Sequence, residues 1–249
     1  MSVGLVIVSH SAKLAEGVRE LAAQMARDVR LEPAGGTDDG GIGTSLEKIQ
    51  TAISAADTGD GVLLLADLGS AVMTAETAVE FLDDEQRARV RLADAPLVEG
   101  TVAAAVAAQS GRDLTAVLQE AEAAGHLPPS AGAANSTANA STGQRTDASD
   151  EPDAMEDDLD PADAGVHTGS WELINPAGLH ARPAAAVAQA MSDLDAEIRI
   201  NGVDAKSVMM LMTLGLGQGQ TLTLTARGPD AARAVDIMAL EVRNGFGEI

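Results

Sequence analysis

The sequence contains no cysteine and no tyrosine, and it has one tryptophan and two phenylalanines among 249 residues. Without cysteine the chain can form no disulfide, no thiolate metal site and no thiol nucleophile. The scarcity of aromatic rings argues against nucleic-acid binding by base stacking. A core must therefore be built from Ala, Val, Leu, Ile and Met, which suits helices packed closely on a sheet.

Positive charge is also scarce, with 16 Lys and Arg residues against 38 Asp and Glu residues and a net charge of −22. Phosphates repel such a polyanion, so we expect neither a nucleic-acid partner nor a membrane partner. No uninterrupted apolar run reaches about 18 residues, and the N-terminus lacks the basic stretch and cleavage site of a signal peptide. These features predict a soluble, cytoplasmic protein.

The first part of the chain, residues 1–125, alternates between strand-like and helix-like patterns. Continuous apolar runs are typical of strands that are covered on both faces. The strand-like segments are 3–8, 61–69 and 88–98, the helical segments are about 12–27, 45–56, 71–82 and from 99 onward, and a Gly-rich loop spans 34–45. This order predicts the α/β fold class, with a mostly parallel sheet and helices on both faces.

Residues 126–169 are rich in Ser, Ala, Gly and Pro and then acidic, with no hydrophobic periodicity. Such a segment cannot bury enough apolar area to offset the entropy of ordering, so it is predicted to be a flexible linker. From residue 170 to 249 short strands and helices resume, which predicts a small α+β domain of four strands packed on helices. The chain is therefore expected to hold two domains on a tether.

The stretch NPAGLHARP places His180 between a turn and a helix. Gly178 permits the turn, and the second proline suits the first turn of a helix. His180 is then expected at the N-cap, where the N–H groups of Ala181 and Arg182 and the Arg182 guanidinium form an anion site. A neutral imidazole at an anion site can attack a phosphoryl group. A purely structural capping role for His180 fits the pattern equally well.

A second histidine, His10, ends the first apolar run, where ligands gather in open parallel sheets. Asp67 ends another run, so its carboxylate could fix the His10 tautomer and leave the other ring nitrogen nucleophilic. A structural hydrogen bond between the two explains the spacing as well. Further candidates for contacts with phosphate are Ser9, Ser11, Gly69 and Ser70, and, more weakly, Thr37 and Gly43 in the Gly-rich loop, which lacks the Lys-Ser/Thr of a P-loop and is interpreted as a lip of the site.

Residues 170–249, with the stretches NPAGLHARPAAAVAQAM and KSVMMLMTLGLGQGQ, are similar to HPr, the histidine phosphocarrier of the phosphoenolpyruvate-dependent phosphotransferase system. The resemblance implies an open-faced α+β sandwich in which enzyme I phosphorylates His180 on Nδ1, with Arg182 assisting. Ser207 matches a serine that is a regulatory phosphorylation site in some members of that family. We interpret Ser207 here as a helix-capping residue.

Residues 1–125, with LVIVSHSAKLAEG, DLGSAVMTAETAVE and APLVEGTVAAAVAAQSG, resemble the mannose-type enzyme IIA fold. The form they resemble is that of the DhaM family, the phosphoryl-donor subunits of phosphotransferase-dependent dihydroxyacetone kinase. This resemblance implies that His10 carries a phosphoryl group on Nε2, that Asp67 supports it, and that the domain forms a homodimer. It implies no metal and no cofactor.

Together the two resemblances imply a phosphohistidine relay. The phosphoryl group would pass from phosphoenolpyruvate and enzyme I through His180 and His10 to ADP on the DhaL-type kinase subunit, for use on dihydroxyacetone held by the DhaK-type subunit. Some family members carry a further enzyme I-like segment, and this sequence stops at Ile249, so we expect it to depend on a separate enzyme I. His126 and His167 are expected to be solvated and without a role.

Two alternatives remain open from the sequence. A fusion of enzyme IIA with HPr could serve a mannose-class sugar transporter, although the sequence contains no IIB-like or membrane segment that favours one. A regulatory module whose histidine phosphorylation signals nutrient state is the alternative from another functional class.

Overall fold

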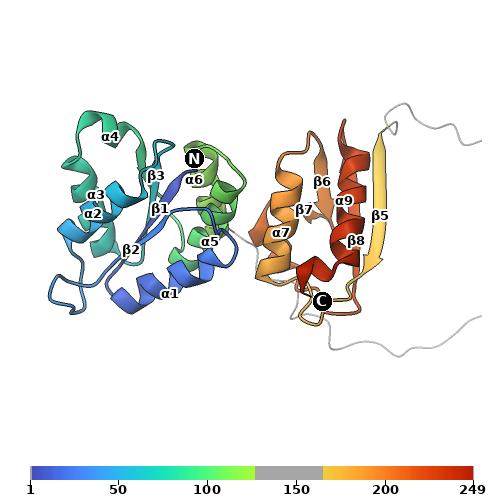
Figure 1. Ribbon diagram of the computed structural model, residues 1–249, viewed down its shortest axis with the longest axis horizontal. Coiled ribbons are helices and arrows are strands. Elements are labelled where there is room, and N and C mark those ends of the chain that lie inside the picture. Colours follow the sequence, from blue (N-terminus) through green and yellow to red (C-terminus); the bar gives the residue numbers. More distant parts are fainter. Residues whose placement is uncertain (1, 127–164, 249) are drawn as a thin grey trace, which may run out of the picture.

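The computed structural model describes residues 2–126 and 165–248. Most of the predicted linker, residues 127–164, lies outside the described residues. The described chain forms two layered units, each with its own sheet (Figure 1). None of the helices in these residues combines the length and hydropathy of a transmembrane span.

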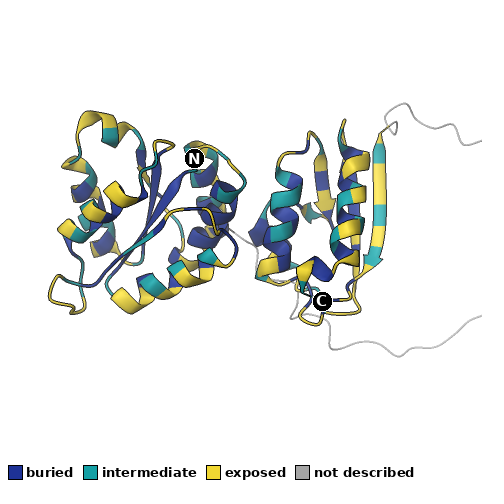
Figure 2. Cartoon of the chain, in the orientation of Figure 1, coloured by how far each residue is buried: buried dark blue, intermediate teal, exposed yellow. Residues whose placement is uncertain are grey.

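The first unit is built on a parallel four-stranded sheet in the order β2-β1-β3-β4. Its strands are β1 (Gly4–Ser9), β2 (Leu31–Gly35), β3 (Val62–Ala66) and β4 (Val90–Leu92). Alternate residues of β1 face opposite layers, Leu5 and Ile7 with one set of helices and Val6 and Val8 with the other. Since helices cover both faces, the central strands are buried along their whole length (Figure 2). The predicted α/β architecture is confirmed.

Helices cover both faces of this sheet. Those that pack on the Leu5 face are α1 (Ala12–Ala23), α5 (Leu97–Gln109) and α6 (Leu114–Ala123), followed by the short η1 (Ala124–His126). Those on the Val6 face are α2 (Leu46–Ala56) and α3 (Gly69–Glu80), with the five-residue α4 (Asp84–Ala88) before β4.

The first unit differs from the sequence prediction in four elements, one of which is the short helix α4, which was not predicted. The edge strand β2 was not predicted, because its sequence LEPAG contains a proline, which a sheet tolerates at an edge. The predicted strand 88–98 shrinks to the three residues of β4, and α5 begins at Leu97 within that range. The helix expected from 99 onward is two helices, separated at Gly111, whose φ is +75°.

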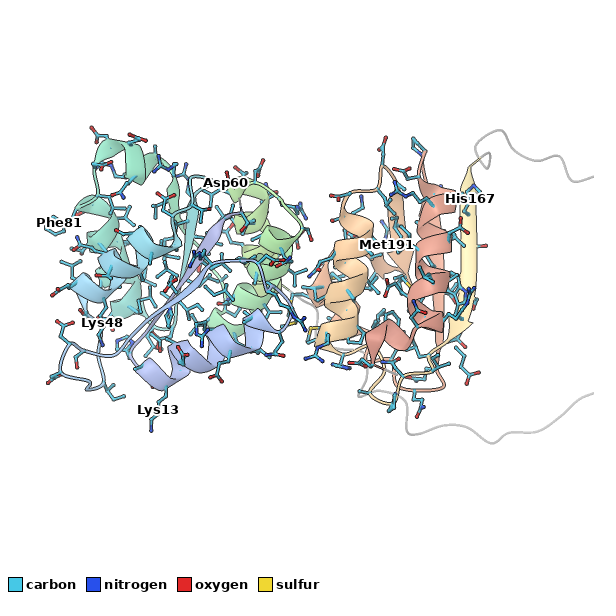
Figure 3. The ribbon with its side chains drawn as sticks, viewed as in Figure 1. Lys13, Lys48, Asp60, Phe81, His167 and Met191 are labelled. Atoms are coloured by element: carbon cyan, nitrogen blue, oxygen red, sulfur yellow. The ribbon has the colours of Figure 1, made fainter. Side chains whose placement is uncertain are left out.

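The second unit has an antiparallel sheet in the order β5-β8-β6-β7. Its strands are β5 (Val166–Glu172), β6 (Glu197–Ile200), β7 (Val203–Asp204) and β8 (Thr221–Arg227), and its helices are α7 (Ala181–Ser192), α8 (Val208–Thr213) and α9 (Ala231–Arg243), with η4 (Gly245–Gly247) at the end. Leu222 and Leu224 of β8 alternate with exposed threonines and face the helices, whose Met191 points into the same core (Figure 3). This is the expected open-faced α+β sandwich.

Strand β5 starts four residues before the expected beginning of the second unit, so His167 lies in a strand. The side chain of His167 is exposed at this edge strand, where its register partner on β8 is Ala226. Its exposure confirms the expectation that this side chain is solvated.

Gly178 fixes the approach to His180. Its φ is +68°, and an added Cβ would lie 2.1 Å from the carbonyl oxygen of Leu216. The neighbouring Leu179 N–H donates to that same oxygen at 2.7 Å, which ties the two loops together. A side chain at position 178 would therefore meet both an unfavourable backbone conformation and a backbone clash.

We expect Gly178→Ala to lower the free energy of unfolding of the second unit by about 3 kcal/mol, since strain and clash add. Gly215→Ala is the matched control, because Gly215 also has a positive φ (+56°) but nothing within 4 Å of an added Cβ; its cost should stay near 1 kcal/mol. Denaturant titration followed by fluorescence of Trp171, the single tryptophan of the chain, reports on this unit. Equal losses in the two variants would contradict the role of the clash.

Candidate functional site

His10 lies at the carboxyl edge of the parallel sheet, beside Asp67. Strands β1 and β3 are neighbours, with Val8 in register with Ala66, so the residues that follow them meet at one edge. His10 Nδ1 is 2.8 Å from Asp67 Oδ1, and the His10 backbone N–H donates to Oδ2 at 2.9 Å. The sheet topology thus produces the juxtaposition that the sequence predicted.

The Asp67 carboxylate is held in its ionised form by several donors. Burial alone would raise the pKa of Asp67, but donors outweigh it and lower the pKa: the backbone and ring N–H of His10, the Ser9 hydroxyl and the Leu68 N–H. Ser9 Oγ donates to Oδ2 and Leu68 N–H to Oδ1, both at 2.8 Å. An ionised carboxylate accepts from Nδ1–H, which leaves Nε2 of His10 with its lone pair.

The other ring nitrogen faces the start of α3. His10 Nε2 lies 2.7 Å from Ser70 Oγ, and the first N–H groups of α3, at Gly69 and Ser70, belong to a helix end whose donors have no intrahelical acceptor. Ser11 is instead the N-cap of α1, where its Oγ accepts from Leu14 N–H. Nε2 therefore points to a hydroxyl donor and a helix N-terminus, a favourable place for an anion.

The Gly-rich loop borders this site, as predicted. Gly43 N–H donates to the His10 carbonyl oxygen at 2.9 Å. Lys48 Nζ donates to the carbonyl oxygens of Gly35 and Thr37, at 3.2 and 2.7 Å, and so anchors the loop from α2. Thr37 points its hydroxyl at Asp39 and not at His10. The Gly-rich loop therefore helps to hold the His10 backbone in place, and the Thr37 hydroxyl is bonded to Asp39 instead of the imidazole.

His180 occupies the N-cap of α7, but its imidazole does not cap the helix. Its backbone is extended, its carbonyl accepts from Ala184 N–H at 2.9 Å, and its side chain makes no capping hydrogen bond. The capping alternative that the sequence left open is therefore wrong for the side chain. With 41% of its side chain exposed against 21% for His10, His180 is the more accessible imidazole.

Glu248 holds His180 from the end of the chain, a contact that the sequence analysis missed. His180 Nε2 lies 2.8 Å from Glu248 Oε1, and buried Asn175 donates through Nδ2 to Glu248 Oε2 (3.0 Å) and to the Gly178 carbonyl (2.8 Å). The sequence GFG before Glu248 was the available signal, because its three residues all have positive φ and turn the chain back towards His180. Phe246 anchors this turn in the core.

The remaining candidates of the second unit lie near His180 but not on its ring. Ala181 and Arg182 begin α7, so their N–H groups are at the helix end next to the imidazole. The Arg182 guanidinium donates through Nη2 to Gln24 Oε1 in the first unit, at 2.9 Å. Ser207 is the N-cap of α8, its Oγ accepting from Met210 N–H, which confirms its predicted capping role.

The two histidines are held by opposite ring nitrogens. A carboxylate lies on Nδ1 of His10 and on Nε2 of His180. In each case the carboxylate stabilises the tautomer that carries a proton on its own side, so the free lone pair is on Nε2 of His10 and on Nδ1 of His180. In this tautomer each ring could act as a nucleophile through one defined nitrogen.

Two family models match the two units. The model described as PTS system fructose IIA component matches residues 4–118, and the model described as PTS HPr component phosphorylation site matches residues 168–244. Among solved structures, HPr-C-His from Thermoanaerobacter tengcongensis is 36% identical over 33% of this chain and 98% of that chain, with a TM-score of 0.32.

One curated relative covers nearly the whole chain, and another covers about half of it. The phosphoryl donor subunit DhaM of the PEP-dependent dihydroxyacetone kinase from Providencia stuartii is 34% identical over 99% of this chain and 50% of its own length. The phosphoryl donor subunit DhaM of PEP-dependent dihydroxyacetone kinase 2 from Listeria innocua is 40% identical over 47% of this chain and 95% of its own length. The chain thus spans about half the length of the first of these relatives and nearly all of the second. It belongs to the DhaM family of phosphoryl donor subunits.

Proposed function

We propose that the chain is a two-step phosphohistidine relay, a phosphotransferase subunit that feeds a dihydroxyacetone kinase. The phosphoryl group enters at Nδ1 of His180, moves to Nε2 of His10 and leaves for ADP on a DhaL-type subunit. The opposite tautomers of the two histidines carry this proposal, because they supply one nucleophilic nitrogen in each domain.

The transfer between the two rings balances without an acid or a base. The lone pair of His10 Nε2 attacks phosphorus, the P–Nδ1 bond of His180 breaks, and the released pair returns to Nδ1. Each ring keeps the proton that it donates to its carboxylate, Asp67 or Glu248. What the protein must supply is in-line positioning and charge neutralisation.

Charge neutralisation comes from different groups at the two sites. At His10 the Ser70 hydroxyl is hydrogen-bonded to Nε2 of the unphosphorylated ring. Once the ring is phosphorylated, this hydroxyl and the first N–H groups of α3 can donate to phosphoryl oxygens. At His180 the N–H groups of Ala181 and Arg182 begin α7, and the Arg182 guanidinium is within reach of the same helix end once it leaves Gln24.

The proposed partners follow from this sequence of transfers. Enzyme I charged by phosphoenolpyruvate donates to His180, and the ADP-carrying DhaL-type and dihydroxyacetone-binding DhaK-type subunits act after His10. We also propose a homodimer through the IIA-like domain and a cytoplasmic location, where phosphoenolpyruvate and ADP are available. The names of the relatives support the kinase as the acceptor over a mannose-class sugar transporter or a regulatory target.

Replacing each histidine separately tests the order of the relay. With enzyme I and labelled phosphoenolpyruvate, His180→Ala should remove label from both positions, because the entry nucleophile is gone. His10→Ala should leave His180 labelled and abolish formation of dihydroxyacetone phosphate by the kinase subunits. His167→Ala, at an exposed position of the edge strand β5, is the control. Normal kinase flux with either the His10 or the His180 variant would overturn the relay.

Asp67→Asn tests the tautomer at His10. An amide can donate to Nδ1 and so favour the proton on Nε2, which removes the reacting lone pair; we expect His10 labelling to slow by about 10²- to 10⁴-fold. Labelling of His180 should be unchanged, and Glu80→Gln, an exposed carboxylate on α3, should behave as wild type. Unchanged His10 labelling in Asp67→Asn would show that the carboxylate has only a structural role.

The lowered pKa of Asp67 also predicts a pH dependence of stability. A carboxyl whose pKa is lower in the folded than in the unfolded protein stabilises the fold above the unfolded pKa, and this contribution is lost as pH falls through the folded pKa. Denaturant titrations from pH 6 down to about pH 3 should therefore show a smaller loss of stability for Asp67→Asn than for wild type. Parallel curves would contradict this linkage.

Glu248→Gln tests the corresponding contact at His180. The amide can present either its oxygen or its NH₂ group to Nε2, so the tautomer is no longer fixed, and we expect His180 labelling to slow by about tenfold. Transfer from enzyme I is measured directly, and ¹⁵N chemical shifts of the His180 ring report the tautomer. Wild-type shifts together with a wild-type rate would exclude a role for Glu248.

A further inference from the structure

The two domains share an apolar contact on the side of the sheet covered by α1, α5 and α6. Figure 1 shows α7 beside α5 of the first domain. Met25, just beyond α1, and Val106 of α5 belong to the same buried cluster as Val208 and Met209 of α8. Val106 is 4% and Met209 7% exposed in the full chain. The outer face of α5 is therefore covered by the HPr-like domain.

Polar contacts reinforce this arrangement at the end of α1. Gln189 of α7 donates through Nε2 to the Met25 carbonyl oxygen at 2.8 Å. Arg182, which is on the same face of α7 as Gln189, donates to Gln24 Oε1 at 2.9 Å. The face of α7 that carries Arg182 and Gln189 thus lies against the first domain.

The contact is at the wrong end of α1 for transfer to His10. Ser11, next to His10, caps the N-terminus of α1, whereas Gln24 follows its C-terminus. Twelve residues of helix separate the two ends by roughly 18 Å. Phosphoryl transfer requires both nitrogens within bonding approach of one phosphorus, about 3–3.5 Å. A domain held by Arg182 and Gln189 at Gln24 and Met25 cannot present His180 to His10 of the same chain.

We propose that this contact is a resting, docked state in which the IIA-like domain covers the docking face of the HPr-like domain. It withholds Arg182 from His180 and occupies the α7 and α8 surface beside the imidazole. A phosphoryl donor, and later His10 itself, gains that surface only after the domains separate. This inference rests on the proposed function for its kinetic consequence, but the docked state itself is a structural claim.

Val106→Glu tests the docking without any phosphoryl transfer. A carboxylate in the apolar contact must be desolvated when the domains dock, so it should favour separation. Val98→Glu is the matched control, because Val98 is on the same helix but 37% exposed. In the full chain, ¹⁵N relaxation should give one shared rotational correlation time for both domains in wild type and Val98→Glu, and two shorter, separate times in Val106→Glu.

The kinetic test uses the same variants with enzyme I and labelled phosphoenolpyruvate. Since only the open fraction accepts the phosphoryl group, a chain docked about 90% of the time should label His180 about tenfold faster once Val106→Glu opens it. Conversely, Met25→Cys/Gln189→Cys joined by a short bis-maleimide should slow labelling, and each single cysteine variant is its control. The chain has no native cysteine to interfere.

The outcomes separate the docked state from the relay. Independent tumbling of the two domains in wild type would overturn the docked state. The docked state would also be overturned if Val106→Glu converted a dimer into a monomer and left the tumbling of the two domains coupled, because α5 would then be a subunit interface. Should Val106→Glu fail to fold by circular dichroism, Gln189→Ala in α7 provides the second opening variant. Coupled tumbling without any His180 labelling would instead sustain the docked state and contradict the proposed function.

Discussion

The hydrogen bond between a carboxylate and one ring nitrogen of each histidine is the interaction on which the two sites depend. A free imidazole exchanges its proton between two nitrogens, and only one of them faces a partner in a given site. Asp67 removes this ambiguity at His10, and Glu248 removes it at His180. The first contact is secured by neighbouring parallel strands, and the second by a left-handed turn at the end of the chain. Two different folds thus fix the tautomer of a histidine by the same kind of hydrogen bond.

The two solutions differ in rigidity and in access. Asp67 follows a buried central strand and is fixed by donors from both β1 and the start of α3, so the His10 site is set by the sheet. Glu248 is held through Asn175 and a short turn anchored by Phe246, and His180 is the more exposed ring. An exposed ring on a small domain is suited to meeting several surfaces in turn, whereas a ring at a sheet edge is suited to one fixed approach. This contrast is consistent with entry at His180 and exit at His10.

Sequence reasoning reached the parts of these sites that depend on local pattern. His10 and Asp67 both end apolar strands, and parallel topology brings such ends together, so their contact was predictable. The turn and helix around His180 were predictable from glycine and proline. The contact between Glu248 and His180 was not predictable, because it joins residues 68 positions apart. It also needs the positive φ of Phe246, which no local preference favours for a bulky residue.

The fold shows the same division between local and distant information. The buried strands β1 and β3 were identified from their apolar runs. The edge strand β2 contains a glutamate and a proline, which interrupt the apolar run that would identify a strand. The direction of Arg182 depends on a contact with Gln24, 158 residues away, and no motif encodes it. Where a side chain's partner comes from another domain, composition and periodicity contain no signal for it.

The proposed docked state places a limit on how strong the contact between the domains can be. Covalent connection raises the effective concentration of one domain near the other into the millimolar range, so even a weak contact is occupied. A net preference of about 1.4 kcal/mol keeps roughly nine-tenths of the chains closed and slows each encounter only about tenfold. A contact several kcal/mol stronger would stop the relay. The small apolar side chains of α5, chiefly Ala and Val, bury little area each, which keeps the contact within this limit while still shielding the face of α7 that carries Arg182.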